Sequence, residues 1–141
     1  MSVISTASTA WQGSLFEGAG TVTFDTSGLG TYDVNWKARS EGSNSVTTPE
    51  ELIAAAHSAC FSMAFSAALA KNGTPPSSLN TTAKVTFVPG TGITGSHLTV
   101  TATVPGLDAA TFDELAASAK ANCPVSQALA GIDITMDATL A

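Results

Sequence analysis

The first part of the chain alternates between apolar and polar positions, which is typical of half-buried strands. The alternation runs from Ser8 to Phe24 and is broken by the glycine-rich stretch "EGAG". Short strands joined by a turn are therefore expected here. The apolar positions that would face a core are Trp11, Leu15, Val22 and Phe24.

The alternation returns in "TYDVNWKAR", which predicts a further strand that ends near Arg39. A polar loop, "SEGSNSVTT", follows, and then a helix is expected from about Pro49 to Asn72. The start of this helix fits a capping box, with Thr48 as the N-cap residue and Glu51 reaching back to it.

The second half of the chain changes back to strand-like spacing. "LNTTAKVTFVP" and "SHLTVTATVP" alternate around the glycine-rich "GTGITG", which predicts a hairpin. "LDAATFDELAASAKAN" predicts a second helix, "CPVSQALAG" a short third helix, and "IDITMDATL" a last strand. The order of these elements indicates an α+β fold with a mainly antiparallel sheet. With 141 residues in the chain, a single domain over residues 1–141 is expected.

The long helix has no charged residue between Leu52 and Ala70, which raises the question of a membrane span. A span needs about 20 mainly apolar residues. This segment is instead rich in Ala and Ser, contains His57, and ends in "KNG" as a helix in water does. We therefore expect a central helix that is buried nearly all round, partly by a second copy of the chain.

The charge of the chain narrows its possible partners. A net charge of −6 argues against binding to nucleic acid, which needs clustered Lys and Arg. Charged residues make up 11% of the chain, against about 25% in typical domains, so surplus apolar surface indicates an oligomer. The start of the sequence has no pattern of a secretory signal, and a cytoplasmic location is expected.

Cys60 lies in the middle of the long helix among Ala, Phe and Met residues. Burial alone would keep such a thiol neutral and inert, so a reactive Cys60 needs a cation nearby. His57 is one turn earlier on the same helix face, and Arg39 precedes the loop into the helix. The alternative is that both cysteines of the chain are buried and inert.

Cys123 directly precedes Pro124 in "ANCPVSQAL". If Pro124 begins a helix, Cys123 is its N-cap, where N–H groups and the helix dipole lower the pKa of a thiol. The alternative is a chain turn with a small buried residue. By local physics, Cys123 is thus the more easily ionised thiol.

The two glutamates at the start of the long helix have different expected roles. Glu51 closes the capping box, whereas Glu50 is not needed for it. Glu50 could therefore accept a bidentate hydrogen bond from Arg39 and hold its guanidinium in place. The alternative is that Glu50 only complements the helix dipole.

Several kinds of site are absent from the sequence. There is no C-x-x-C pair, phosphate-binding loop, dinucleotide fingerprint or G-x-S-x-G motif. The two cysteines are too few for a structural zinc site even with His57 and His97. His97 lies in a strand-like segment and is expected at the surface.

"PEELIAAAHSACFSMA" together with "NCPVSQAL" resembles the OsmC branch of the OsmC/Ohr family of cysteine-based hydroperoxide reductases. The resemblance covers essentially the whole chain, including "EGAGTV", "KARSEG", "VPGLDAATFDELAASAKANCPVS" and the closing strand. The arginine in "KARSEG" favours the OsmC branch, because the Ohr branch takes its arginine from an earlier strand.

The resemblance implies a role for four residues, at which this chain shows no departure from the family pattern. Cys60 would be the peroxidatic cysteine, which becomes a sulfenic acid, and Cys123 the resolving cysteine, which then forms a disulfide with it. Arg39 and Glu50 would be the pair that activates the thiol.

The resemblance also implies an OsmC-like fold, in which sheets pack on long central helices and two chains form an intertwined homodimer with active sites at the subunit interface. No cofactor or metal is implied. The reductant would be a thiol, which in the Ohr branch belongs to a lipoylated protein. Apolar side chains near Cys60, such as Phe61, Met63 and Phe65, are expected to favour organic hydroperoxides over hydrogen peroxide.

Two other functions remain as alternatives. One is a non-catalytic redox switch or binding module whose shape changes with a Cys60–Cys123 disulfide. The other is acyl chemistry by Cys60 and His57, which would need an oxyanion hole and a group that orients the base. Neither of those groups is visible in the sequence.

Overall fold

The computed structural model describes residues 1–141, and their contacts divide the chain into two compact units, Met1–Pro49 and Glu50–Ala141. The first unit holds an antiparallel three-stranded sheet in the order β1-β2-β3, followed by a short helix, α1. Its elements are β1 (Ala7–Gln12), β2 (Ala19–Phe24), β3 (Thr31–Val34) and α1 (Trp36–Glu41).

The segment after β3 is a helix, so the prediction of a strand up to Arg39 was wrong. Asn35 caps α1, because its side-chain Oδ1 accepts a hydrogen bond of 2.7 Å from the Ala38 N–H. Gly42 ends the helix with a positive φ of 86°. The alternation of apolar and polar residues predicts a strand, but it takes no account of the N-cap. In a segment this short, the hydrogen bond from the asparagine cap is enough to favour a helix.

The first unit buries little apolar area of its own. Val22 is buried as predicted and Phe24 is partly buried, but Trp11 and Leu15 remain 40% and 51% exposed. The prediction that Trp11 and Leu15 belong to a core is therefore wrong for the single chain. Every residue of β1 is exposed, which leaves this strand without a covering layer.

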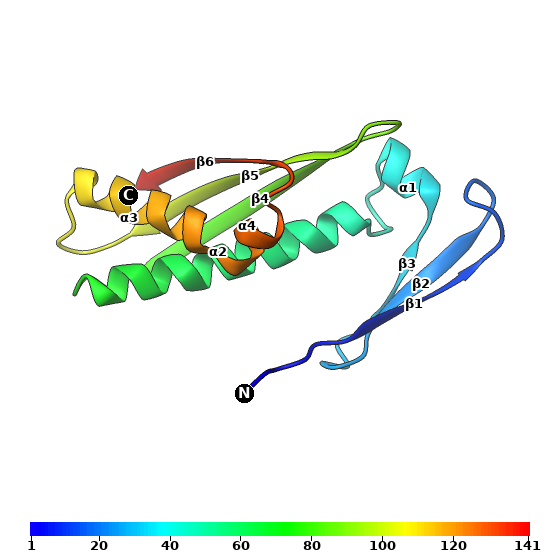
Figure 1. The fold of residues 1–141 in the computed structure, drawn as a ribbon, viewed down its shortest axis with the longest axis horizontal. Coiled ribbons are helices and arrows are strands. Elements are labelled where there is room, and N and C mark those ends of the chain that lie inside the picture. Colours follow the sequence, from blue (N-terminus) through cyan, green and yellow to red (C-terminus); the bar gives the residue numbers. More distant parts are fainter. The chain divides into compact units, whose positions relative to one another are not determined.

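The second unit holds a three-stranded sheet in the order β4-β5-β6 together with three helices (Figure 1). β4 and β5 pair antiparallel as the predicted hairpin, whereas β5 and β6 pair parallel. The parallel pair follows from the chain between them, which crosses over as α3 and α4. The elements are α2 (Pro49–Lys71), β4 (Ser78–Val88), β5 (Gly92–Thr103), α3 (Ala109–Asn122), α4 (Pro124–Ala128) and β6 (Asp133–Leu140).

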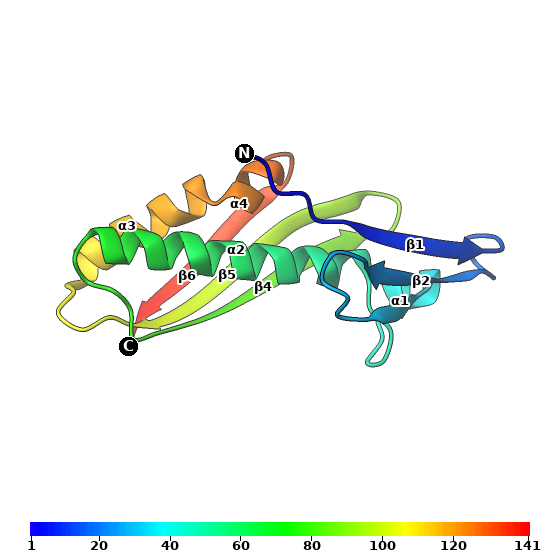
Figure 2. The same ribbon diagram turned by 90° about the horizontal axis from the view of Figure 1, so that it is seen from below.

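The core of the second unit lies between one face of this sheet and the helices α2 and α3. Figure 2 shows α2 running along that face with α3 and α4 beside it. Alternate residues of β5 point toward the helices, and three aromatic rings pack together beneath them. The fully buried side chains include Phe61, Phe65 and Leu69 of α2, Leu98 and Val100 of β5, and Phe112 of α3.

Within one chain the long helix α2 is buried on one face only, and the predicted cover of its other faces by a second copy of the chain stays a prediction. Its buried residues recur every fourth position from His57 to Leu69. The opposite face, exposed to solvent, carries Ala55, Ala59 and Met63. By length and composition alone α2 could cross a membrane, with a mean hydropathy of 1.6. However, one face of α2 packs on the sheet, and the buried residues of that face include the imidazole of His57. This is the arrangement of a helix that lies on a sheet.

Candidate active site

The structure brings the two cysteines together. Cys60 is on α2 and Cys123 is at the junction of α3 and α4, yet their thiols lie 3.2 Å apart and are hydrogen-bonded. Both are free thiols. A disulfide has an S–S length of about 2.05 Å, so a bond between these sulfurs needs only a small movement.

The two thiols differ in exposure and in acidity. Cys60 is partly exposed, whereas Cys123 is fully buried. Burial raises the pKa of Cys60, the Val125 N–H opposes this, and the neighbouring Cys123 raises the pKa further. Cys60 is therefore the thiol that solutes can reach, but its surroundings in this unit keep it protonated.

Cys123 has the lower pKa of the pair. Burial acts to raise this pKa, but hydrogen bonds from the Ser126 N–H, the Cys60 thiol and the Ser126 hydroxyl outweigh it. Cys123 is the N-cap residue of α4 with Pro124 in the first turn, as the sequence predicts. Its sulfur closes no capping hydrogen bond of regular geometry, and the nearby N–H groups nevertheless favour the thiolate.

His57 is not the cation that Cys60 would need. Its ring is fully buried, and both of its nitrogens are taken by serine hydroxyls: Nδ1 is 2.7 Å from Ser96 Oγ and Nε2 is 2.8 Å from Ser126 Oγ. Burial lowers the pKa of His57, so the ring is neutral at neutral pH. No carboxylate orients the ring. The acyl-chemistry alternative therefore lacks the group that should orient His57 as a base.

The sequence reasoning missed Ser96 and Ser126, which are both buried. Ser96 alternates with Leu98 and Val100 on the inner face of β5, and Ser126 lies three positions after the N-cap of α4. A serine at a core position of a strand is a weak signal that a buried polar partner lies opposite. Without knowing which helix covers β5, that partner could not be named.

The two predicted activating residues lie in different units. Arg39 is in the last turn of α1 in the first unit, and Glu50 is in the first turn of α2, at the start of the second. Glu50 is only 6% exposed, whereas Glu51 is exposed. A buried carboxylate needs a hydrogen-bonding partner, and no buried side-chain oxygen or nitrogen in the structure lacks one. The different exposure fits different roles for the two glutamates.

The aromatic residues beside Cys60 do not line an open approach to it. Phe61 and Phe65 are fully buried and stack in the core, while Met63 is 73% exposed on the opposite face of α2. The prediction that these three residues form an apolar lining is therefore wrong for the single chain. Helix geometry explains the error, because residues next to Cys60 in sequence point in other directions.

A groove of about 510 Å³ lies between α2 and α3. It begins at Ala64 and Ala119, each one helical turn from one of the two cysteines, and Leu115 adds to its apolar wall. Its far end is polar, with Lys71 and Asn72, whereas Asn122 lines the near end beside Cys123. The groove thus offers an apolar surface near the thiol pair within the second unit.

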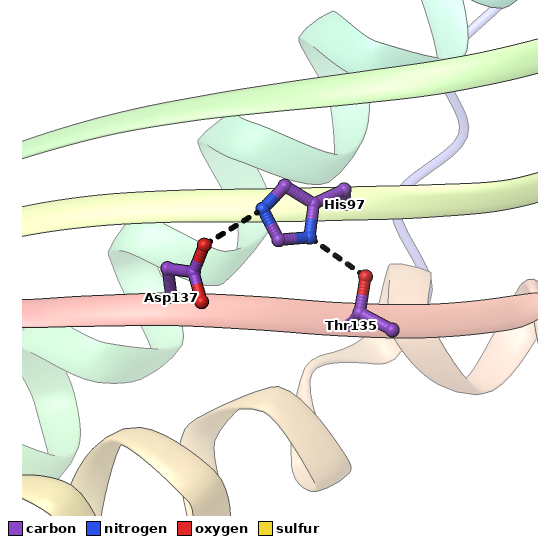
Figure 3. A network of polar contacts seen from close by, with 3 residues as sticks. All are labelled: His97, Thr135 and Asp137. Atoms are coloured by element: carbon purple, nitrogen blue, oxygen red, sulfur yellow. Dashed lines mark hydrogen bonds and ion pairs between the residues drawn. The ribbon is translucent and has the colours of Figure 1, made fainter.

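His97 is on the other face of the sheet and is separate from the thiol pair. Figure 3 shows it between two residues of the neighbouring strand β6, with Nδ1 2.7 Å from Thr135 Oγ1 and Nε2 3.3 Å from Asp137 Oδ2. Its side chain is 37% exposed, in agreement with the expected surface position. No group of three or more His, Cys, Asp and Glu residues that could hold a metal ion is present.

Comparison with known proteins gives one consistent result. A family model described as OsmC-like protein matches residues 42–137, a range that includes Glu50, Cys60 and Cys123 but not Arg39. Peroxiredoxin OsmC of Escherichia coli (strain K12) is 45% identical over 130 residues, which are 90% of this chain and 90% of that protein. Peroxiredoxin OsmC of Shigella flexneri matches with the same identity and coverage.

Solved structures agree with this result. The organic hydroperoxide resistance protein OsmC of Legionella pneumophila has a TM-score of 0.72 and 25% identity, and the match covers 99% of this chain and 100% of that one. The organic hydroperoxide resistance protein of Elizabethkingia anophelis has a TM-score of 0.71 and 26% identity, with both chains covered completely. The sequence-based α+β fold is thereby confirmed.

The lowered pKa of His57 predicts a pH dependence of stability. In the unfolded chain the pKa is near 6.5, and in the folded chain it is lower, so the unfolded state binds more protons between the two values. The stabilisation is present above about pH 6.5 and is lost as the pH falls toward the lowered pKa. Thermal unfolding should therefore show a steeper loss of Tm on acidification in wild type than in His57→Gln.

Wild type and His57→Gln at higher pH provide the control. Above about pH 7.5 the imidazole is neutral in both states, so the two Tm curves should run parallel there whatever their offset. Parallel curves through the acid range as well would contradict a lowered pKa of His57.

Proposed function

The chain belongs to the OsmC-like protein family and is a thiol-dependent peroxidase, and we propose that it reduces organic hydroperoxides through Cys60. In this proposal the Cys60 thiolate attacks the peroxide, and Cys123 resolves the product as a disulfide. The observation that carries the proposal is the 3.2 Å contact between the two thiols within one chain. Exposure sets their order, because only Cys60 can be reached from solvent.

The first step transfers one oxygen atom. The Cys60 thiolate attacks the outer peroxide oxygen, an S–O bond forms, and the O–O bond breaks. The leaving alkoxide takes a proton and departs as an alcohol. Cys60 is now a sulfenic acid, oxidised by two electrons.

The second step removes that oxygen as water. The Cys123 thiolate attacks the Cys60 sulfur, the S–S bond forms, and the S–O bond breaks while the leaving hydroxide takes a proton. A dithiol reductant then returns both cysteines to thiols by exchange. Sulfur carries the electrons in every step, so the proposal uses no metal or prosthetic group.

The proposal assigns to Arg39 the cation that Cys60 lacks in its own unit. Burial and the neighbouring Cys123 raise the pKa of Cys60, so reactivity requires a positive charge that reverses this effect. Arg39 is the only arginine of the chain, and Glu50 would hold its guanidinium by a bidentate hydrogen bond. The same guanidinium would stabilise the alkoxide as it leaves.

Organic hydroperoxides are proposed as the substrates. The groove between α2 and α3 supports this, since it presents apolar side chains to the alkyl part of a substrate. Ala64 and Ala119 are each one helical turn from a thiol, and Leu115 is one turn further along α3. The solved relatives from Legionella pneumophila and Elizabethkingia anophelis are both organic hydroperoxide resistance proteins. We further propose a cytoplasmic location and a thiol reductant of the dithiol type, such as a lipoylated protein.

The functional unit is proposed to be an intertwined homodimer in which residues 1–141 of each chain form one OsmC-like domain. The exposed faces of the single chain support this. β1 is uncovered along its length, Phe16 and Leu29 are each 76% exposed, and the outer face of α2 bears no charge around Met63. A partner copy would cover such surfaces.

Replacing Cys60 tests the peroxidase chemistry. Cys60→Ser should lose peroxide consumption with dithiothreitol as reductant, because serine forms no sulfenic acid. Cys123→Ser should accumulate a sulfenic acid on Cys60 that a dimedone-type probe captures and mass spectrometry locates. Equal peroxide turnover in wild type and Cys60→Ser would end the proposal. Stoichiometric oxidation of wild type without turnover would favour the redox switch instead.

Two matched pairs of variants test the activating residues. Arg39→Ala should lower kcat/KM for an alkyl hydroperoxide by roughly 100-fold, because it removes the positive charge that stabilises thiolate and alkoxide. Glu50→Gln should also lower it, because the Arg39 guanidinium loses the carboxylate that holds it in place. Lys37→Ala is the control for α1, and Glu51→Gln is the control for α2. An equal loss in a variant and its control would show that the assigned roles are wrong.

The homodimer predicts a particle of twice the chain mass of 14.1 kDa by light scattering at micromolar concentration. Met63→Lys places a charge in the uncovered face of α2 and should shift the equilibrium toward the monomer. Thr82→Lys, an exposed change on β4, is the control and should stay dimeric. A wild-type monomer would refute the assembly.

A further inference from the structure

A chain of buried polar side chains leads from β5 to the resolving thiol. The Ser96 hydroxyl is 2.7 Å from His57 Nδ1, and His57 Nε2 is 2.8 Å from the Ser126 hydroxyl. Ser126 follows the N-cap residue Cys123 by three positions on α4, and its hydroxyl lowers the pKa of that thiol. Cys123 in turn contacts Cys60. His57 and Cys123 are fully buried, and the two serines are 2% and 6% exposed.

The hydrogen positions in this row of hydrogen bonds follow from the ionisation of Cys123. A thiolate can only accept, so the Ser126 hydroxyl donates its single proton to sulfur. Ser126 Oγ then accepts from the Nε2–H of His57, and the unprotonated Nδ1 accepts from the Ser96 hydroxyl. A neutral imidazole provides this one donor and one acceptor, and the lowered pKa of His57 keeps it neutral.

We propose that Ser126, oriented by His57, is a positioning residue that holds the Cys123 thiolate for its attack on the Cys60 sulfenic acid. This inference rests on the proposed function, because it assigns a role within the resolving step. His57 acts through Ser126, and its ring fixes the direction in which the hydroxyl donates. Ser96 fixes the tautomer of the ring from the opposite side.

The location of these hydrogen-bonded side chains argues for more than a packing role. His57, Phe61, Phe65 and Leu69 form the buried row of α2, and an apolar residue would fill the first position at no polar cost. The imidazole instead requires two buried serines from two other elements, β5 and α4. One end of this arrangement is the sulfur that must ionise.

No other charge near His57 explains its placement. The two elements that hydrogen-bond to it are β5 and α4, α4 has no charged residue, and burial is the cause of its lowered pKa. The only titratable residue of β5 is His97, which points to Thr135 and Asp137 on the outer face of the sheet (Figure 3). Cys60 is the titratable group in direct contact with Cys123.

The role is confined to one chemical step. In resolution the Cys123 thiolate gives an electron pair to the Cys60 sulfur, and the S–O bond of the sulfenic acid breaks to release hydroxide, which takes a proton to become water. The Ser126 hydroxyl stabilises the thiolate before this attack and aims its lone pairs. Oxygen transfer to Cys60 precedes that step and does not involve Ser126.

Titration of a single thiol tests the inference without any peroxide. In a Cys60→Ser background Cys123 is the only thiol, and its thiolate is followed by ultraviolet absorbance against pH. Adding Ser126→Ala should reduce the thiolate fraction at neutral pH about tenfold, the effect of one hydrogen bond to a charged group. Adding Ser126→Thr, which keeps the hydroxyl, should restore it. His57→Gln should move the titration in the same direction as Ser126→Ala.

Ser62→Ala is the matched control. Its hydroxyl also joins α2 to the sheet, donating to Thr81 Oγ1 at 2.8 Å, but it belongs to a different contact. A purely structural role for Ser126 would give similar Tm losses in Ser62→Ala and Ser126→Ala with no change in the Cys123 titration. That result would overturn the inference, and so would an unchanged titration in His57→Gln.

Rapid-mixing kinetics in the two-cysteine protein separate the steps. Ser126→Ala should form the Cys60 sulfenic acid at the wild-type rate and convert it to the disulfide about tenfold more slowly. A slower first step with unchanged resolution would overturn the inference while leaving the peroxidase intact. Absence of any sulfenic acid in wild type would instead refute the proposed function, and the titration would still decide the role of Ser126.

Discussion

The packing of α2 against β5 is the contact on which the second unit depends. Phe61, Phe65 and Leu69 recur at helical spacing and are fully buried against Leu98 and Val100 of the strand. Burying each such side chain contributes roughly 1.5–3 kcal/mol, and together they set the rotation of the helix about its axis. That rotation also determines where His57 and Cys60 point, because both lie on the same length of helix.

The same packing creates the chemical difficulty of the site. A helix that is apolar for many residues makes a good core, but it gives a thiol no charge with which to ionise. The structure places the more acidic thiol, Cys123, where it is fully buried, and the less acidic one, Cys60, where solutes can reach it. Acidity and access are thus divided between two sulfurs in contact, which suits a reaction that uses them in succession.

Polar groups enter this core only as a complete set. His57, Ser96 and Ser126 leave no buried side-chain donor or acceptor without a partner. A partly satisfied set would cost more than an apolar core, so the three residues depend on one another. On the outer face of the sheet, His97 and Asp137 form a solvent-exposed ion pair, where water can also satisfy their polar atoms. The sheet therefore separates a buried group of hydrogen bonds from a solvent-exposed ion pair.

The sequence alone determined most of the elements, and it singled out the two cysteines that the structure places 3.2 Å apart. Capping and periodicity located α2, the β4–β5 hairpin, α3 and β6, because these signals are local and repeat over many residues. They failed at α1, where one asparagine cap over a short run outweighed the alternation. Local chemistry also identified Cys123 as the more acidic thiol from its position before Pro124.

Only the tertiary structure decided which face of α2 is buried, and with it the partners of each side chain. Phe61 and Phe65 went into the core instead of lining an approach to Cys60, and His57 met two serines rather than a thiol. These outcomes depend on β5 and α4, which are far from α2 in sequence and reach it only through the fold. Spacing along a chain specifies which residues share a face, but the element that covers that face is chosen by packing between distant segments.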